Sequence, residues 1–256
     1  DCCGNQGVSF CDDADGVVWA WQVARQVSSQ PRVVVEQRLM GVEYSIVYAL
    51  TGGEARMLRF GAVYNEPGYP TNLYDFGTTI APGYEAYMGG ADAAVRQVLK
   101  AAGCREGIAW IQAIRGQDGV FRLFEMGYRL SADMAFNKMI SMTGFDAIRW
   151  LLELQMGMGH DEAQLPCPPA RELRESSNVY CMFAAVAGTI DRIEGIGFID
   201  GSLVDDPDAQ PGLEEDHVSV DVIARPGMEV RPGRLLGKLT FHAWSAEGVV
   251  ATMRRI

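Results

Sequence analysis

The chain has 256 residues, of which 48% are hydrophobic and 21% charged, and its formal net charge is −11. This profile is typical of a globular protein with a real core. No apolar run approaches the roughly 20 residues that cross a bilayer, and an acidic chain is a poor partner for a nucleic-acid backbone. We therefore expect neither a membrane nor a nucleic acid among its partners.

Cysteine and histidine usage narrows the class further. The six cysteines have no zinc-site spacing and the three histidines are widely separated, so metal binding by these residues and histidine-based catalysis are not expected. Scattered thiols fit a reducing compartment, which predicts a cytoplasmic protein. The chain opens with DCCGNQGV and no initiator methionine. We expect it to be the later part of a longer protein.

The first part of the chain predicts a helix followed by strands. Helical spacing of apolar residues indicates a helix over residues 12–27, capped by Asp12 or Asp13. Alternating and β-branched runs then predict three strands, at residues 32–39, 42–50 and 55–64. The glycine- and proline-rich residues 65–90 predict a long loop.

The second part predicts a helix at residues 91–103 that ends at Gly103, and then a hairpin of strands 107–114 and 120–126. Further helices are expected at residues 132–142 and from Thr143 onward. Residues 160–177 resemble a linker, and short strands with glycine and proline turns follow it, before a helix capped at Ser245. The fold class expected is α+β, with an antiparallel sheet flanked by helices and a small β-rich C-terminal unit.

The hairpin places two polar side chains together. If Asp118 and Gly119 are the centre of a two-residue turn, counting back along both strands puts Gln112 opposite Glu125. Glu125 would then share its face with Phe121 and Leu123. A carboxylate on such an apolar face needs a partner, and Mg²⁺, which takes oxygen ligands, is one candidate. The alternative is that Glu125 pairs with a nearby arginine, since structural ion pairs are common.

Taken in chain order, four features resemble the ATP-grasp superfamily of carboxylate–amine ligases. They are the glycine-rich CGNQGV, the following helix, the segment VVVEQRLMGVEYSI, and a hairpin that ends FEMGYRL. The resemblance covers residues 1 to about 157. It implies a remnant of the glycine-rich-loop subdomain at residues 1–30, a nucleotide- and metal-binding subdomain at residues 31–160, and the β-rich unit at residues 175–256.

The resemblance also implies roles for individual residues. Gly4, Asn5, Gln6 and Gly7 would cover the ATP phosphates with backbone donors. Glu36, Gln37 and Leu39 would lie beside the adenine, and Glu43 would hold the ribose hydroxyls. Gln112 and Glu125 match the metal-ligand positions for Mg²⁺ or Mn²⁺, and Arg129 matches the arginine near the transferred phosphate, the catalytic position.

Two departures from the family pattern are expected to weaken metal binding. Gln112 stands where most relatives carry an acid, and Gly127 stands where many have Asn. The family's phosphate-binding lysines and its N-terminal substrate domain would precede Asp1. We therefore expect residues 1–256 alone not to be a competent ligase.

The function expected is an ATP-dependent ligase that activates a small carboxylate, with amino acids as the substrate class, for attack by an amine. A carbamoyl-phosphate-synthase-like or carboxylase-like enzyme that uses bicarbonate is the alternative within the enzyme class. A nucleotide-binding protein without ligase chemistry is the rival from another class, and neutral Gln112 is its best argument. The sequence leaves the acid, the amine and the oligomeric state open, including a homodimer.

Overall fold

The structure is a computed structural model, and its described residues fall into ten segments. They are residues 7–30, 32–64, 76–78, 83–131, 145–165, 178–193, 198–199, 202–203, 219–231 and 234–241. Several predicted features lie outside these residues. They are the glycine-loop residues Gly4, Asn5 and Gln6, the helix at residues 132–142, the helix start at Thr143 and the helix at Ser245.

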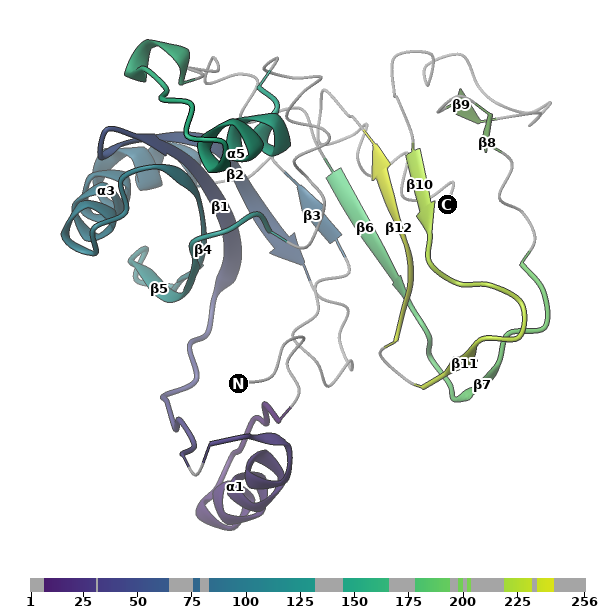
Figure 1. Cartoon of the computed structure of the whole chain (residues 1–256). Coiled ribbons are helices and arrows are strands. Elements are labelled where there is room, and N and C mark those ends of the chain that lie inside the picture. Colours follow the sequence, from purple (N-terminus) through teal and green to yellow (C-terminus); the bar gives the residue numbers. More distant parts are fainter. Residues whose placement is uncertain are drawn as a thin grey trace.

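An antiparallel sheet organises the described part of the chain (Figure 1). Its eight strands follow the order β10-β12-β6-β3-β2-β1-β4-β5. The strands nearest the predicted site are β1 (Val42–Thr51), β2 (Glu54–Tyr64), β4 (Gly107–Arg115) and β5 (Phe121–Gly127). β3 (Phe76–Thr78) joins them to β6 (Asn178–Phe183), β12 (Leu235–Phe241) and β10 (Ser219–Val222). The predicted α+β class with an antiparallel sheet is confirmed.

Four short strands form two separate pairs. β7 (Gly188–Thr189) pairs with β11 (Glu229–Val230), and β8 (Phe198–Ile199) pairs with β9 (Ser202–Leu203). The strands after residue 178 were expected to form a unit of their own. Three of them instead extend the main sheet through β3, so the domain boundary near residue 175 stays a prediction.

One face of the sheet packs against α3 (Asp92–Ala101) and the π-helix η1 (Tyr87–Ala91), which follows the short α2 (Tyr84–Ala86). α3 is amphipathic: Val95 and Leu99, four residues apart, are its buried apolar residues. Gly103, with φ of 77°, follows the helix in the left-handed conformation that was predicted for a helix end. The rings of Tyr44, Phe60, Tyr87 and Phe121 gather in this core at centroid distances of 5.0–6.3 Å.

The opposite face packs against α5 (Ala147–Gln155), near the β1–β2 turn. Its cluster includes Val47, Ile108 and Trp150. α5 starts later than expected: Asp146 is its N-cap, and its carboxylate accepts hydrogen bonds from the backbone N–H groups of Ile148 and Arg149. A short 3₁₀ helix, η2 (Glu162–Gln164), follows within the segment that was expected to be a linker.

α1 (Ala14–Val27) confirms the first predicted helix, and the side chain of Asp13 caps it by accepting the Gly16 N–H at 2.7 Å. None of its residues is buried, and Figure 1 shows it apart from the sheet. The predicted strand at residues 32–39 is wrong. These residues pair with no strand in the described part of the chain, and Val34 and Val35 are 79% and 69% exposed. Burial of an apolar run requires a neighbouring surface, and the sheet begins only at Val42.

The long loop expected at residues 65–90 is also wrong where the structure describes it, because β3, α2 and η1 occupy part of that range. Among the described residues, no helix is both long and apolar enough to cross a membrane.

A buried hydrogen-bond network connects β1 to the helices η1 and α3. The Tyr48 hydroxyl donates to Asp92 Oδ1 at 2.8 Å, so the Tyr87 hydroxyl, also 2.8 Å away, must donate to Tyr48. Arg96 lies 2.9 Å from the other oxygen of Asp92. Burial raises the pKa of Tyr48 and keeps its hydroxyl protonated as a donor.

We expect Tyr48→Phe to lower the free energy of unfolding by about 1–3 kcal/mol, because it leaves the buried Tyr87 hydroxyl without an acceptor and removes a donor from Asp92. Urea unfolding measures the change. Tyr128→Phe, at a tyrosine that is 48% exposed, is the matched control and should cost less because water replaces the lost partner. Equal losses in both variants would contradict the role of the network.

Candidate functional site

The β4–β5 hairpin brings Gln112 and Glu125 directly opposite each other, as predicted. The route to this pairing differs from the prediction. The turn is longer than two residues, so Arg115 pairs with Phe121 and Ala113 with Leu123. Phe124 then remains unpaired as a β-bulge, and the register beyond it is the predicted one.

The bulge separates Glu125 from two residues that were expected to share its face. Phe121 packs in the core under α3, and Leu123 pairs with buried Ala113 of the same core. The expectation that Glu125 shares a face with Phe121 and Leu123 is therefore wrong. It followed from a two-residue turn, whereas each one-residue change of register reverses the faces.

Glu43 on β1 lies beside this pair. Gln112 Nε2 donates to Glu43 Oε1 at 2.8 Å, although the resemblance gave the two residues separate tasks at the metal and at the ribose. Glu43, Gln112 and Glu125 come from three adjacent strands. We call these two carboxylates and the amide between them the acidic trio. Among the described residues, no Lys or Arg forms an ion pair with either carboxylate of the trio.

The electrostatic environment of Glu43 is unusual for a carboxylate. Burial, with a further contribution from the charge of Glu125, raises the pKa of Glu43 from 4.5 to about 7, and the hydrogen bond from Gln112 lowers it only in part. The site therefore holds two carboxylates that repel each other near neutral pH.

Arg129 follows β5 and lies across an aromatic ring. Its guanidinium carbon is 5.2 Å from the centroid of Trp110, and its Nη1 donates to the Leu130 carbonyl at 2.8 Å. Trp110 is itself fixed, because its Nε1 donates to Ser45 Oγ at 2.9 Å. A guanidinium over an indole face is a favourable cation–π arrangement.

Gly127 makes room for this arrangement. A Cβ at position 127 would lie 3.3 Å from the Trp110 ring and 3.5 Å from Nε of Arg129. A larger residue would therefore have to displace the ring or the guanidinium. This gives a physical reason for Gly127 at a position where asparagine was the family expectation.

Sequence reasoning placed Trp110 on the face of Gln112 without giving it a role, and it did not consider Ser45, although a signal for both existed. Ser45 is two residues after Glu43, and Trp110 is two residues before Gln112. Side chains two residues apart in a strand point to the same face. Alternation alone would have added both residues to the site.

The remaining predicted nucleotide contacts belong to less packed segments. Glu36 and Gln37 are exposed and Leu39 is half-buried, in the chain that precedes β1. Gly7 has φ of 80°, and a Cβ there would lie 2.5 Å from the Val27 side chain, so only glycine fits. Gly4, Asn5 and Gln6 lie outside the described residues.

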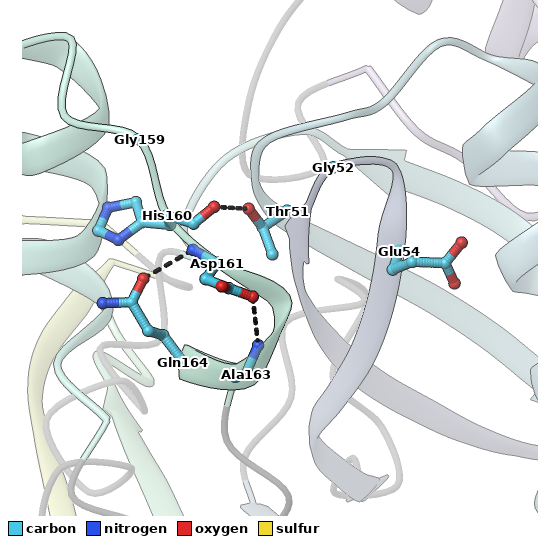
Figure 2. Close-up of a pocket in the computed structure, with 8 residues that line it drawn as sticks. All are labelled: Thr51, Gly52, Glu54, Gly159, His160, Asp161, Ala163 and Gln164. Carbon is cyan, nitrogen blue, oxygen red and sulfur yellow. Dashed lines mark hydrogen bonds between the residues drawn. The ribbon is translucent and has the colours of Figure 1, made fainter.

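A polar hollow of about 770 Å³ opens at the other end of β1 (Figure 2). It is lined by Thr51, Gly52, Glu54, Gly159, His160, Asp161, Ala163 and Gln164. Thr51 stands eight residues beyond Glu43 on β1, roughly 26 Å away at about 3.3 Å per residue. This hollow is therefore separate from the acidic trio, and none of the predicted site residues lines it.

Comparisons with known proteins identify the fold. No family model matches the chain, and no curated protein matches it by sequence. Solved structures do match. L-amino acid ligase from Bacillus licheniformis has a TM-score of 0.64 at 19% identity, over 86% of this chain and 51% of that one.

Two further structures agree. The biotin carboxylase domain of 2-oxoglutarate carboxylase from Hydrogenobacter thermophilus, in complex with MgADP and bicarbonate, has a TM-score of 0.65 at 16% identity, over 98% of this chain and 53% of that one. Phosphoribosylglycinamide synthetase from Anaerococcus prevotii has a TM-score of 0.66 at 9% identity, over 97% and 61%. The chain has the ATP-grasp fold and spans about half the length of these structures.

We expect Glu43→Gln to stabilise the protein at pH 8 and to change little at pH 4.5. Because the folded-state pKa of about 7 lies above the unfolded value, the free energy of unfolding should fall as pH rises from 4.5 to 7, by about 3 kcal/mol in total. The variant has no such proton to lose. Urea unfolding at both pH values measures the difference.

Glu54→Gln is the matched control, since it removes a carboxylate that is 56% exposed at the start of β2. It should show no comparable gain at pH 8. A Glu43→Gln variant that is less stable than the unchanged protein at pH 8 would contradict the electrostatic account of Glu43.

Proposed function

We propose that the chain carries the metal- and phosphate-binding half of an ATP-dependent ligase. The enzyme activates a carboxylate as an acyl phosphate and joins it to an amine, with amino acids as the substrate class. One observation carries the proposal. Glu125 and Gln112 stand opposite each other on a sheet of the ATP-grasp fold, with Arg129 two residues beyond the end of β5.

The donor atoms of the site fit a divalent cation. Mg²⁺ takes oxygen ligands, often one or two carboxylates with water and phosphate completing the set. Glu125 offers a carboxylate, and Gln112, whose amide nitrogen bonds Glu43, has its amide oxygen left to offer. Gln112 and Glu125 would hold Mg²⁺ or Mn²⁺. The bound cation would offset negative charge on the transferred phosphoryl group.

Arg129 would act on the same charge from the protein side. Its guanidinium presents several N–H donors to anionic oxygens. Trp110 and the Leu130 carbonyl hold it in place, so little conformational freedom is lost when it binds an anion. It would bind the transferred phosphoryl group or the acyl phosphate.

The other predicted residues would bind the nucleotide. Backbone N–H groups of Gly4, Asn5, Gln6 and Gly7 would cover the phosphates and exclude water. Glu36, Gln37 and Leu39 would lie along the adenine, and the resemblance gives Glu43 the ribose. The cytoplasmic location and a homodimer are part of the proposal. The latter draws on the Hydrogenobacter protein, which its name describes as a domain dimer.

Two specific observations favour other functions. The Hydrogenobacter structure holds bicarbonate, which supports bicarbonate as the acid in a carboxylase-like or carbamoyl-phosphate-synthase-like reaction. Neutral Gln112 lowers the ligand charge and supports a nucleotide-binding protein without ligase chemistry. The assay that separates these functions is the dependence of phosphate release on the acid supplied.

We expect ATP-dependent phosphate release that requires a pair of amino acids, measured on the longest natural polypeptide that contains these residues. Glu125→Gln should lower the rate about 100-fold or more, because the variant holds the divalent cation less well. The negative charge on the transferred phosphoryl group then loses the cation that offsets it. Glu54→Gln, on β2 outside the acidic trio, should leave it unchanged.

Each alternative has its own result in this assay. Release that requires bicarbonate and no amino acid favours the carboxylase-like enzyme. Nucleotide binding without acid-dependent release favours the non-catalytic protein. Undiminished turnover in Glu125→Gln would contradict the metal assignment.

A further inference from the structure

We propose that Trp110 and Ser45 are positioning residues for Arg129. The face of the indole ring holds the guanidinium, and Ser45 fixes the ring. This inference rests on the proposed function for the anion that Arg129 binds, which is the transferred phosphoryl group or the acyl phosphate. Trp110 and Ser45 act through the arginine and not on the substrate directly.

Arg129 needs support because it lies just beyond the edge of the sheet. In the described part of the chain, β5 is the last strand of the sheet order, and Arg129 follows it as an exposed residue. A long, exposed side chain samples many rotamers, and an anion that binds it has to fix one of them. A partner that holds the guanidinium beforehand removes most of that cost.

Both partners of Arg129 connect it to the core. Its guanidinium carbon lies 5.2 Å from the Trp110 ring centroid, and its Nη1 donates to the Leu130 carbonyl at 2.8 Å. Trp110 and Leu130 pack against the same apolar cluster, which contains Phe145 and Trp150 of the α5 side. Packed side chains have few alternative positions. The exposed arginine is therefore attached to a rigid part of the protein at both contacts.

Ser45 determines how the indole ring is turned. Trp110 Nε1 donates to Ser45 Oγ at 2.9 Å, from β4 to the neighbouring strand β1. Ser45 is buried, with 5% of its surface exposed. The indole N–H is a donor only, so a ring turned over would leave this donor without its acceptor. The hydrogen bond therefore selects one ring orientation, the one that the guanidinium covers.

Gly127 provides the space for the ring and the guanidinium. Trp110 pairs with Gly127 across β4 and β5. A Cβ at position 127 would lie 3.3 Å from the ring and 3.5 Å from both Cγ and Nε of Arg129. An aromatic side chain opposite a glycine on an edge strand is a known way to stabilise a sheet. Trp110 thus covers the glycine and carries the arginine at the same time.

A double-mutant cycle tests the contact without a catalytic assay. Urea unfolding compares the unchanged protein with Trp110→Leu, Arg129→Ala and the double variant, on the longest natural polypeptide that contains these residues. We expect non-additive losses, with a coupling factor of about two- to fivefold in the unfolding equilibrium constant, as for a cation–π pair at an exposed site. The factor should fall in a Ser45→Ala background and persist with Ser45→Thr, which keeps the hydroxyl.

The phosphate-release assay tests the positioning role. Trp110→Leu should lower kcat about tenfold or more and leave the KM for ATP within about twofold, because the arginine is misplaced while the nucleotide contacts remain. Trp110→Phe keeps an aromatic face and should recover part of the loss. Guanidinium ion, added well below unfolding concentrations, should restore part of the release in Arg129→Ala. It should restore none in the double variant with Trp110→Leu.

α1 offers a matched control. The guanidinium carbon of Arg25 lies 5.4 Å from the Trp21 ring centroid, and Trp21 is 48% exposed. Trp21→Leu makes the same substitution in a similar pair outside the sheet, and it should change neither kcat nor the KM for ATP. Circular dichroism of each variant confirms folding.

Three results contradict the positioning role. They are additive losses in the double-mutant cycle, an unchanged kcat in Trp110→Leu, and rescue by guanidinium ion that is the same with and without the indole ring. The proposed function fails separately. If the unchanged protein releases no phosphate with any acid, the ligase is ruled out and the double-mutant cycle alone decides whether Trp110 holds Arg129.

Discussion

A single unpaired residue, Phe124, determines which face of the sheet carries Glu125. Without the bulge, the register set at the turn would continue and Glu125 would face the α3 core, opposite buried Ile111. An isolated carboxylate there would be costly. With the bulge, Phe121 and Met126 stay on the side of the core while Glu125 points to Gln112.

A second bulge does the same for β2. Val47 pairs with Arg59 and Tyr48 with Met57, which leaves Leu58 unpaired. Leu58 packs beneath α5, and Phe60, beyond the bulge, returns to the aromatic core opposite Ile46. Each bulge thus lets its strand keep apolar side chains in the core under α3 on both sides of the bulge, while other side chains of the strand lie on the opposite face of the sheet. The packed core makes the sheet a rigid base, which a site that must position charges requires.

The sequence predicted the elements whose pattern depends on local rules. β1, β2, β4 and β5 follow from alternation, and α1 and α3 from helical spacing with Asp13 and Gly103 at their ends. Residues 32–39 defeated the same reasoning, because an apolar run reports a tendency to be buried without naming the surface that buries it. The Gln112–Glu125 pair was predicted through a turn that is longer in the structure, and the bulge offset the difference. The contact of Glu43 with Gln112 depends on which strands are neighbours, and local pattern does not contain that information.

Neutral Gln112 is best understood through its two neighbours. A glutamate at position 112 would place three carboxylates on adjacent strands, and like charges directly opposite destabilise a sheet. The amide removes one of those charges and also donates an N–H to Glu43, which offsets part of the rise in the pKa of that residue caused by burial and by the charge of Glu125. With Gln at position 112, the three adjacent strands carry two carboxylates, Glu43 and Glu125, instead of three. A pair of acids on β4 and β5 would give the same number of carboxylates. Here they lie on β1 and β5, and the amide of Gln112 on β4 stands between them and donates to Glu43.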